Sequence, residues 1–366
     1  MVAYFGSFGL ICFDHQGEER WRRPMPKPRS FGGNATSPAL FGNRLILYRG
    51  NHVDHYLTAI DKRNGKIIWK VEIDEPFTDE LACTSCPIRH GNQVILHAAR
   101  SVQFFDLMTG RREWQTKAAT TATSTPVIIE DQVIVAAWNK MGEPSLRPSF
   151  PSFAELISEH DANRSRSISK SEFPKLWLFH RPDGMEAPMN GATIRFSKSD
   201  HNRDGIIDEE EWEQTLAGIE AFRSGYQTHG VLAIPLEGQQ DHRLAQVRTL
   251  VKSSVPEVPS PIAYEGVIYT VKNGGVLTSI DYRSGDMTAR LRTKGTGTHY
   301  ASPVIGGDHL YTVSGDGLIS VLSLGAKPEV IATNQMPARV FATPAISDGV
   351  LYVRTHERLH AFSRIR

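Results

Sequence analysis

Twelve consecutive residues, 200–211 (DHNRDGIIDEEE), place oxygen donors at the spacing that one hard cation requires. Calcium takes about six to eight oxygen ligands, and a short loop supplies them from alternate positions and from its last residue. Gly205, at the sixth position, permits the sharp turn that brings the two ends of the loop together. The stretch therefore predicts a calcium site with these ligands: Asp200, Asn202, Asp204, the backbone carbonyl of Ile206, Asp208 (directly or through water) and both carboxylate oxygens of Glu211.

A second stretch of twelve residues, 161–172 (DANRSRSISKSE), begins 39 residues earlier. Its candidate ligands are Asp161, Asn163, Ser165, Ser167 through its carbonyl, Ser169 and Glu172. Both stretches resemble the EF-hand loop, and 200–211 matches that pattern at every demanded position. Ile168 and Ile207 both occupy position eight, where paired loops are expected to join by a short β-bridge. Ser152 and Glu155 predict a capping box before the first loop, and Trp212 begins the apolar face of a helix after the second.

The two loops differ in charge. Residues 200–211 contain six acidic residues and one basic residue, whereas 161–172 contain two acidic and three basic ones. The sixth position of the first loop is Arg166, which has to adopt a left-handed backbone at a free-energy penalty of about 1 kcal/mol. Because calcium affinity rises with ligand charge, we expect the second loop to bind first and more tightly. A metal-free, solvated loop is the alternative reading of both stretches, and it applies more to the first.

A repeat of about 40 residues surrounds this acidic segment. It is marked by a small polar residue or cysteine before a proline, at Pro38, Pro87, Pro126, Pro261, Pro303 and Pro344. Four of the five spacings lie between 39 and 49 residues, and the fifth, 135, contains one period and an insertion of roughly 90 residues. A second marker places a glycine and then a tryptophan after an aspartate, as in Asp61, Gly65 and Trp69. The glycine supplies a positive φ in a hairpin, and the indole ring offers an apolar face to a neighbouring unit.

The combined pattern resembles the PQQ-type repeat of quinoprotein-like β-propellers, over residues 1–140 and 229–366. The resemblance implies an all-β fold of seven propeller units, with residues 141–228 inserted as an α-helical EF-hand module. The insertion interrupts the fourth unit between its second and third strands. The first unit lacks its first strand, so we expect an N-terminally truncated chain, and a parent with eight blades stays open.

Composition excludes several classes of protein. The 366-residue chain carries a net charge of +1, which does not favour nucleic-acid binding, and no apolar run is long enough to span a bilayer. Its three cysteines are too few for a disulfide framework.

Cys83, Cys86 and His90 could supply three zinc ligands, although free thiols are the favoured interpretation. Polar residues before the Ser-Pro pairs are candidates to line the propeller channel: Asn34, Glu80, Glu257, His299 and Arg339.

The family resemblance implies two classes of function. One is a non-catalytic scaffold, like the lipoprotein of the outer-membrane β-barrel assembly machinery, and the other is a quinone-dependent dehydrogenase. Those enzymes carry a catalytic Asp and often a vicinal Cys pair, and no matching residue is found here. We therefore expect a calcium-binding, monomeric scaffold that holds a protein partner on a propeller face, in the periplasm or another extracytoplasmic compartment, without PQQ. A different enzyme or a carbohydrate-binding propeller stays as a further alternative.

Overall fold

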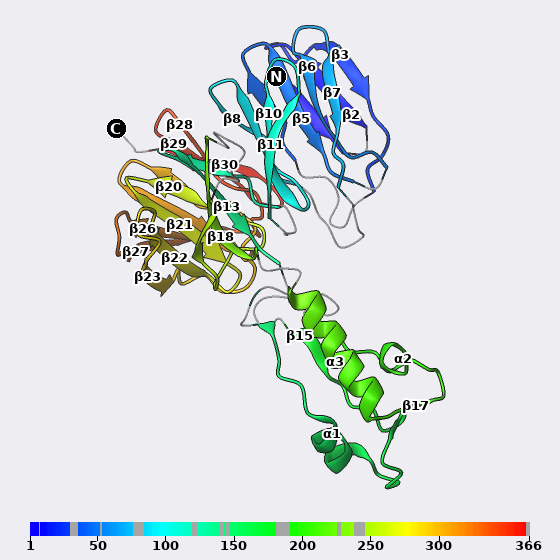
Figure 1. The fold of residues 1–366 in the computed structure, drawn as a ribbon. Coiled ribbons are helices and arrows are strands. Elements are labelled where there is room, and N and C mark those ends of the chain that lie inside the picture. Colours follow the sequence, from blue (N-terminus) through cyan, green and yellow to red (C-terminus); the bar gives the residue numbers. More distant parts are fainter. Residues whose placement is uncertain are drawn as a thin grey trace. The chain divides into compact units, whose positions relative to one another are not determined.

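The computed structural model describes residues 1–6, 8–29, 36–51, 53–75, 84–118, 123–139, 143, 146–180, 191–224, 228–237 and 246–363. The chain divides into two compact units (Figure 1). The first combines residues 1–139 with 228–366, and the second is the inserted segment 140–227.

Seven antiparallel sheets, numbered here as blades in chain order, form a β-propeller in the first unit, as predicted (Figure 1). Blades one to three contain β1 (Val2–Phe5), β2 (Gly9–Phe13) and β3 (Glu19–Pro24), then β4 (Ala39–Phe41), β5 (Arg44–Arg49), β6 (Tyr56–Asp61) and β7 (Ile67–Glu72), then β8 (Ile88–His90), β9 (Gln93–His97), β10 (Ser101–Asp106) and β11 (Arg112–Lys117). Blade four contains β12 (Val127–Ile129), β13 (Gln132–Ala137), β18 (Gly230–Pro235) and β19 (Arg248–Val251). Blades five to seven contain β20 (Ile262–Tyr264), β21 (Val267–Lys272), β22 (Val276–Asp281) and β23 (Met287–Arg292), then β24 (Val304–Gly306), β25 (His309–Val313), β26 (Leu318–Ser323) and β27 (Val330–Gln335), then β28 (Ala345–Ser347), β29 (Val350–Arg354) and β30 (Leu359–Phe362).

The middle strands of each blade are runs of apolar residues because both of their faces are covered by neighbouring blades. Leu45, Leu47 and Ile60 pack against blade one, whereas Ile46 and Leu57 pack against blade three. In blade four, β13 pairs with β18 in the register Ala137↔Gly230. The insertion therefore occupies the hairpin between the second and third strands of that blade, as predicted.

Tryptophan and glycine of the repeat meet across the boundary between blades. Trp21 of blade one lies on Gly65 of blade two, and Trp69 of blade two lies on Gly110 of blade three. A Cβ atom at Gly65 would stand 2.7 Å from the ring of Trp21, and one at Gly110 would stand 2.6 Å from that of Trp69. Each indole N–H also donates a hydrogen bond to a carbonyl in the same turn, at 2.9 Å for Trp21 and 3.1 Å for Trp69. The glycine is thus required both by its positive φ and by the ring that covers it.

The residues before the repeat prolines link successive blades by hydrogen bonds. In each pair, the backbone N–H of one blade donates to the side-chain oxygen or sulfur of the equivalent residue in the next blade. The links run from Ser37 through Cys86, Thr125, Ser260 and Ser302 to Thr343. The donor–acceptor distance is 3.3 Å at the Cys86 sulfur and 2.9–3.0 Å at the hydroxyl acceptors. We call this series the pre-proline chain.

The inserted unit is small and mixed in structure. It contains α1 (Phe153–His160), β14 (Ile168–Ser169), β15 (Trp177–His180), β16 (Gly191–Thr193), α2 (Phe196–Ser199), β17 (Ile206–Ile207) and α3 (Glu209–Ser224). Ile168 and Ile207, the predicted bridging pair, face each other in the two-stranded sheet of β14 and β17. Both are buried with Leu156 of α1 and Trp212 of α3, so one apolar core supports both loops.

Candidate metal site in the inserted unit

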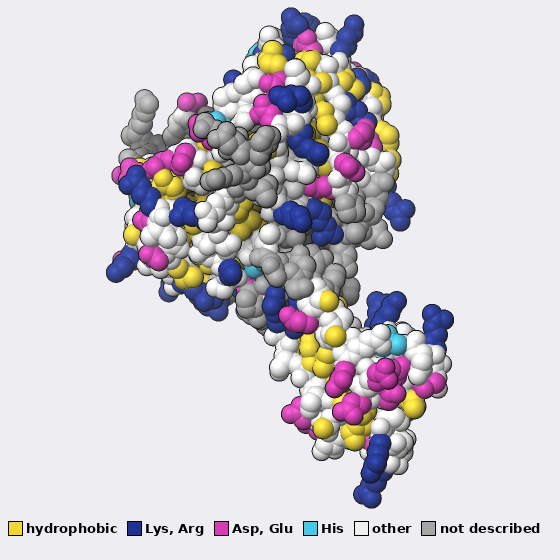
Figure 2. Space-filling view, viewed as in Figure 1, with side chains coloured by type: hydrophobic (Ala, Val, Ile, Leu, Met, Phe, Trp, Pro, Cys, Tyr) yellow, Lys and Arg dark blue, Asp and Glu magenta, His cyan; other side chains and the backbone are white. Residues whose placement is uncertain are grey.

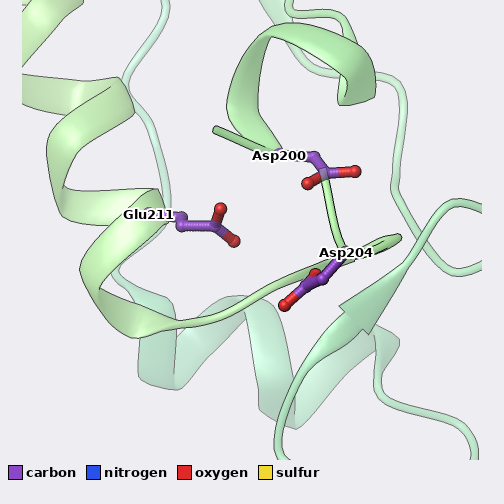
Figure 3. Close-up of side chains that lie close together, drawn as sticks. All are labelled: Asp200, Asp204 and Glu211. Carbon is purple, nitrogen blue, oxygen red and sulfur yellow. The ribbon is translucent and has the colours of Figure 1, made fainter. Parts of the chain in front are cut away.

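Three carboxylates of the second loop converge on one point. Asp200, Asp204 and Glu211 each offer an oxygen atom, and these oxygens all lie within 4.8 Å of one another (Figure 3). Asp200 ends the short helix α2, and its backbone N–H donates to the carbonyl of Phe196. Glu211 belongs to the first turn of α3 and is 5% exposed. The group therefore comes from both ends of the loop.

Backbone N–H groups of the loop hold these carboxylates in place. The N–H of Gly205, whose φ is +92°, donates to Oδ2 of Asp200 at 3.2 Å. The N–H of Asn202 donates to Oε1 of Glu211 at 3.0 Å, and that of Ile206 donates to Oδ1 of Asp204 at 3.0 Å. In contrast, Oδ1 of Asp200 is buried and accepts no hydrogen bond from any residue that the structure describes. A buried, unpaired carboxylate oxygen is unfavourable, and a bound cation would satisfy it.

The other predicted ligands of the second loop lie beside this group. Asn202 receives the N–H of Asp204 on its side-chain oxygen at 2.8 Å. Asp208 receives the N–H of Glu211 at 2.9 Å, and Ile206 lies in β17. All three are in the loop as predicted, but the three converging carboxylates do not include them.

The first loop has the same backbone framework. The N–H of Ser165 donates to the side-chain oxygen of Asn163 at 2.8 Å, and that of Arg166 donates to Oδ2 of Asp161 at 2.8 Å. The N–H of Asn163 donates to Oε1 of Glu172 at 3.3 Å. Arg166 has the left-handed φ, +62°, expected from its position. The framework of a metal loop is therefore present, although serine replaces aspartate at the fifth and ninth positions, where Ser165 and Ser169 stand.

Ligand candidates of the first loop bond to each other instead. The hydroxyl of Ser165 lies 3.1 Å from the carbonyl oxygen of Ser167, to which it donates. The hydroxyl of Ser169 donates to Glu172 at 2.6 Å, and this bond is the main reason why the pKa of Glu172 is lowered. The N–H and the hydroxyl of Ser165 both donate to Oδ1 of Asp161, at 3.0 and 3.4 Å, whereas the equivalent Oδ1 of Asp200 has no hydrogen-bond partner among the described residues. This difference agrees with the weaker metal binding expected from the charge of the first loop.

The helices around the loops depart from a complete EF-hand pair. The predicted capping box is present at the start of α1, where Ser152 and Glu155 bond reciprocally. However, an EF-hand places a helix after its loop, and the described residues 173–176 are irregular and lead into β15. Pro174 explains the difference because it has no N–H to donate and clashes with a preceding helical turn. The first loop therefore has an entry helix, α1, but no exit helix directly after it among the described residues.

The remaining candidates lie in the propeller. Cys86 is a partly buried free thiol whose sulfur belongs to the pre-proline chain, and His90 is exposed on β8. Cys83, Asn34 and Glu80 lie outside the described residues. His299 is only 1% exposed, and burial lowers its pKa. The carbonyl groups of Glu257 and Arg339 accept hydrogen bonds from neighbouring segments.

Sequence reasoning missed a buried charge at the junction of blades one and two. The Arg49 side chain is fully buried and pairs with Asp54 at 3.0 Å. It also donates to the carbonyl of Pro26 at 2.6 Å and to the hydroxyl of Tyr4 at 3.3 Å. The arginine therefore fixes the segment between the first two blades. A lone arginine at the end of an apolar strand gave no signal of this role.

Comparisons with known proteins agree with the repeat. The family model described as outer membrane protein assembly factor BamB matches residues 7–143. The crystal structure of BamB from Moraxella catarrhalis is similar with a TM-score of 0.57 and 11% sequence identity, over 96% of this chain and 77% of the other. No curated protein sequence matches. No helix among the described residues is long and apolar enough to cross a membrane. The chain is thus a β-propeller, similar in sequence to the BamB family model over residues 7–143 and similar to BamB in fold over nearly its whole length.

Proposed function

We propose that this protein is a calcium-binding, non-catalytic β-propeller that serves as an interaction scaffold. The observation that carries the calcium assignment is the convergence of Asp200, Asp204 and Glu211, and it is supported by the buried Oδ1 of Asp200, to which no described residue donates a hydrogen bond. Hard oxygen donors, with no sulfur or imidazole among them, favour calcium or magnesium over zinc. A flexible loop of twelve residues suits calcium better, because magnesium demands a near-ideal octahedron and keeps several waters.

The scaffold part of the proposal is supported by the relatives. BamB is by name an assembly factor of outer membrane proteins, and both the sequence match and the fold point to it. A propeller presents broad faces built from inter-strand loops, where binding residues commonly lie on a rigid framework. We propose that a protein partner binds such a face, and that the protein works in the periplasm or another extracytoplasmic compartment. Binding to partners of BamB itself is not part of the proposal.

Calorimetric titration with calcium tests the metal assignment. Glu211→Gln removes a charge from the converging group, and we expect it to abolish most of the affinity of the tighter site. Glu172→Gln is the matched control at the same position of the first loop, and it should change calcium binding far less. Both variants should keep the propeller folded, as judged by thermal unfolding, because its blades and the loops belong to separate units. Loss of the tight site only in Glu172→Gln would contradict the ranking of the loops.

The non-catalytic assignment has a separate test. The protein is mixed with pyrroloquinoline quinone, calcium and a panel of primary alcohols, and reduction of an artificial electron acceptor is followed by absorbance. We expect no calcium-dependent reduction above a protein-free control. Turnover that requires the quinone would refute the non-catalytic assignment and would show that the protein is a quinone-dependent dehydrogenase.

A further inference from the structure

We infer that the inserted unit has a groove for a cationic, amphipathic segment of a partner protein, next to its metal loop. The groove is an open cavity of about 520 Å³ between helix α1 and the start of helix α3. Its apolar side consists of Phe153, Ala154 and Ile157, which lie along one part of α1. Phe153 and Ile157 also pack against the core of the unit, so this apolar surface is continuous with a rigid support.

The rest of the groove lining is mainly acidic. It is formed by Asp208, Glu209 and Glu210, and Arg166 of the first loop adds one positive charge. Figure 2 shows acidic side chains gathered over the inserted unit. Glu209 and Glu210 stand at positions ten and eleven of the loop, so metal coordination does not account for them. Within the described part of the chain, neither carboxylate has a hydrogen bond or an ion pair, and both residues are exposed.

This combination selects the chemistry of the ligand. An apolar wall favours a hydrocarbon chain or ring, whereas the carboxylates favour a positive charge about one side chain away. A lysine or arginine next to a large apolar residue supplies both features on one protein segment. An acidic segment or an anionic membrane surface would be repelled by the same carboxylates.

The groove shares Asp208 with the proposed calcium site, and this coupling rests on the proposed function. Calcium at 200–211 adds two positive charges beside the groove and attracts the Asp208 carboxylate. Calcium should therefore weaken the binding of a cation in the groove, and by linkage the cation should weaken calcium to the same extent. We expect a change of about fivefold or more in affinity at low ionic strength.

The test uses 4-phenylbutylamine as a probe, with 4-phenylbutyrate as a probe of the same apolar tail and opposite charge. Binding to the whole 366-residue chain without calcium is followed by NMR, through shifts of amides in α1. We expect the amine to bind and the acid to bind more weakly or not at all. Glu209→Gln with Glu210→Gln should weaken the amine by about fivefold or more. Glu159→Gln with Glu213→Gln is the control, because it removes two charges from the same unit outside the groove.

A second variant tests the apolar wall. Ala154 is exposed, so Ala154→Phe should fill the groove without disturbing the core, and it should abolish amine binding. The inference is overturned if amine and acid bind alike, if neither binds at millimolar concentration, or if the two charge variants behave the same. Stronger amine binding with calcium would overturn the coupling. Because the first titrations contain no calcium, their failure is distinguishable from failure of the metal site, which is tested by calcium titration alone.

Discussion

Replacement of Gly110 by alanine tests whether the tryptophan–glycine contacts hold the blades together. Gly110 has a φ of +74°, and a new Cβ would stand 2.6 Å from the ring of Trp69. The left-handed backbone alone costs about 1 kcal/mol for a residue with a Cβ. Overpacking against the indole ring adds roughly 1–3 kcal/mol, and displacement of that ring loses a hydrogen bond worth roughly 1 kcal/mol. We therefore expect Gly110→Ala to lower the free energy of unfolding by about 3–5 kcal/mol.

Substitutions at two other glycines distinguish the free-energy cost of the left-handed backbone from the cost of overpacking a neighbouring side chain. Gly17 has a φ of +87° and open space where a Cβ would go, so Gly17→Ala should cost only about 1 kcal/mol. Gly285 has a φ of +81°, and a Cβ there would stand 3.3 Å from Leu250, so it should be intermediate. The assay is urea denaturation followed by near-ultraviolet circular dichroism. Equal effects of Gly110→Ala and Gly17→Ala would refute the reasoning.

A double-mutant cycle gives the sharper test. Trp69→Leu removes the ring that a Cβ at position 110 would meet, at the expense of its own packing and hydrogen bond. Gly110→Ala should then cost little more in the Trp69→Leu background than Gly17→Ala does in the wild type. The expected interaction energy is about 1 kcal/mol or more, because the two residues are in contact. Additive effects would show that the ring and the glycine act independently.

Three further perturbations probe the propeller. Asp54→Ala leaves the buried Arg49 without its ion-pair partner, and urea denaturation should show a loss of about 3–5 kcal/mol. Burial lowers the pKa of His97 to about 4, below its unfolded value of about 6.5, so its contribution to stability is present above pH 6.5 and lost as the pH falls toward 4. The free energy of unfolding should then decrease by up to about 1.4 kcal/mol per pH unit, as measured by urea denaturation across that pH range. This decrease should be smaller in His97→Gln, whereas the control variant His15→Gln, at an exposed residue, should keep it. Cys86→Ser exchanges the sulfur of the pre-proline chain for a hydroxyl, and thermal unfolding should show unchanged or higher stability, by up to about 1 kcal/mol.

The sequence predicts the propeller well because its signals are local and repeated. A proline after a small polar residue marks each inner strand, and the glycine near Trp69 requires a turn whatever else surrounds it. The partners of these residues could not be predicted, since they come from the next blade: the Cys86 sulfur accepts a bond from Ser37, 49 residues away in the chain. Arg49 was missed for the same reason, because its burial depends on Tyr4 and Pro26.

The candidate metal site could also be predicted where its sequence signal is local, but not where it depends on contacts that the spacing does not reveal. The spacing of 200–211 places the carboxylates on one loop, and the structure brings three of them together. The spacing of 161–172 is similar, but it does not reveal that the hydroxyls of Ser165 and Ser169 donate hydrogen bonds to neighbouring oxygen atoms of the loop. Pro174 is a local signal against a helix directly after this loop. The groove depends on the packing of α1 beside the second loop, which no linear pattern encodes.

The place of the insertion also bears on how the propeller assembles. Strands β13 and β18 are neighbours in the sheet, but about 90 residues separate them in the chain, where an ordinary hairpin of this propeller needs only a short turn. Closing so long a flexible loop costs about 3 kcal/mol more entropy than closing a turn of a few residues. If residues 140–227 fold first, the effective loop becomes short and most of that barrier disappears. Calcium at 200–211 would then hasten the completion of blade four during biosynthesis without touching a single residue of the propeller core.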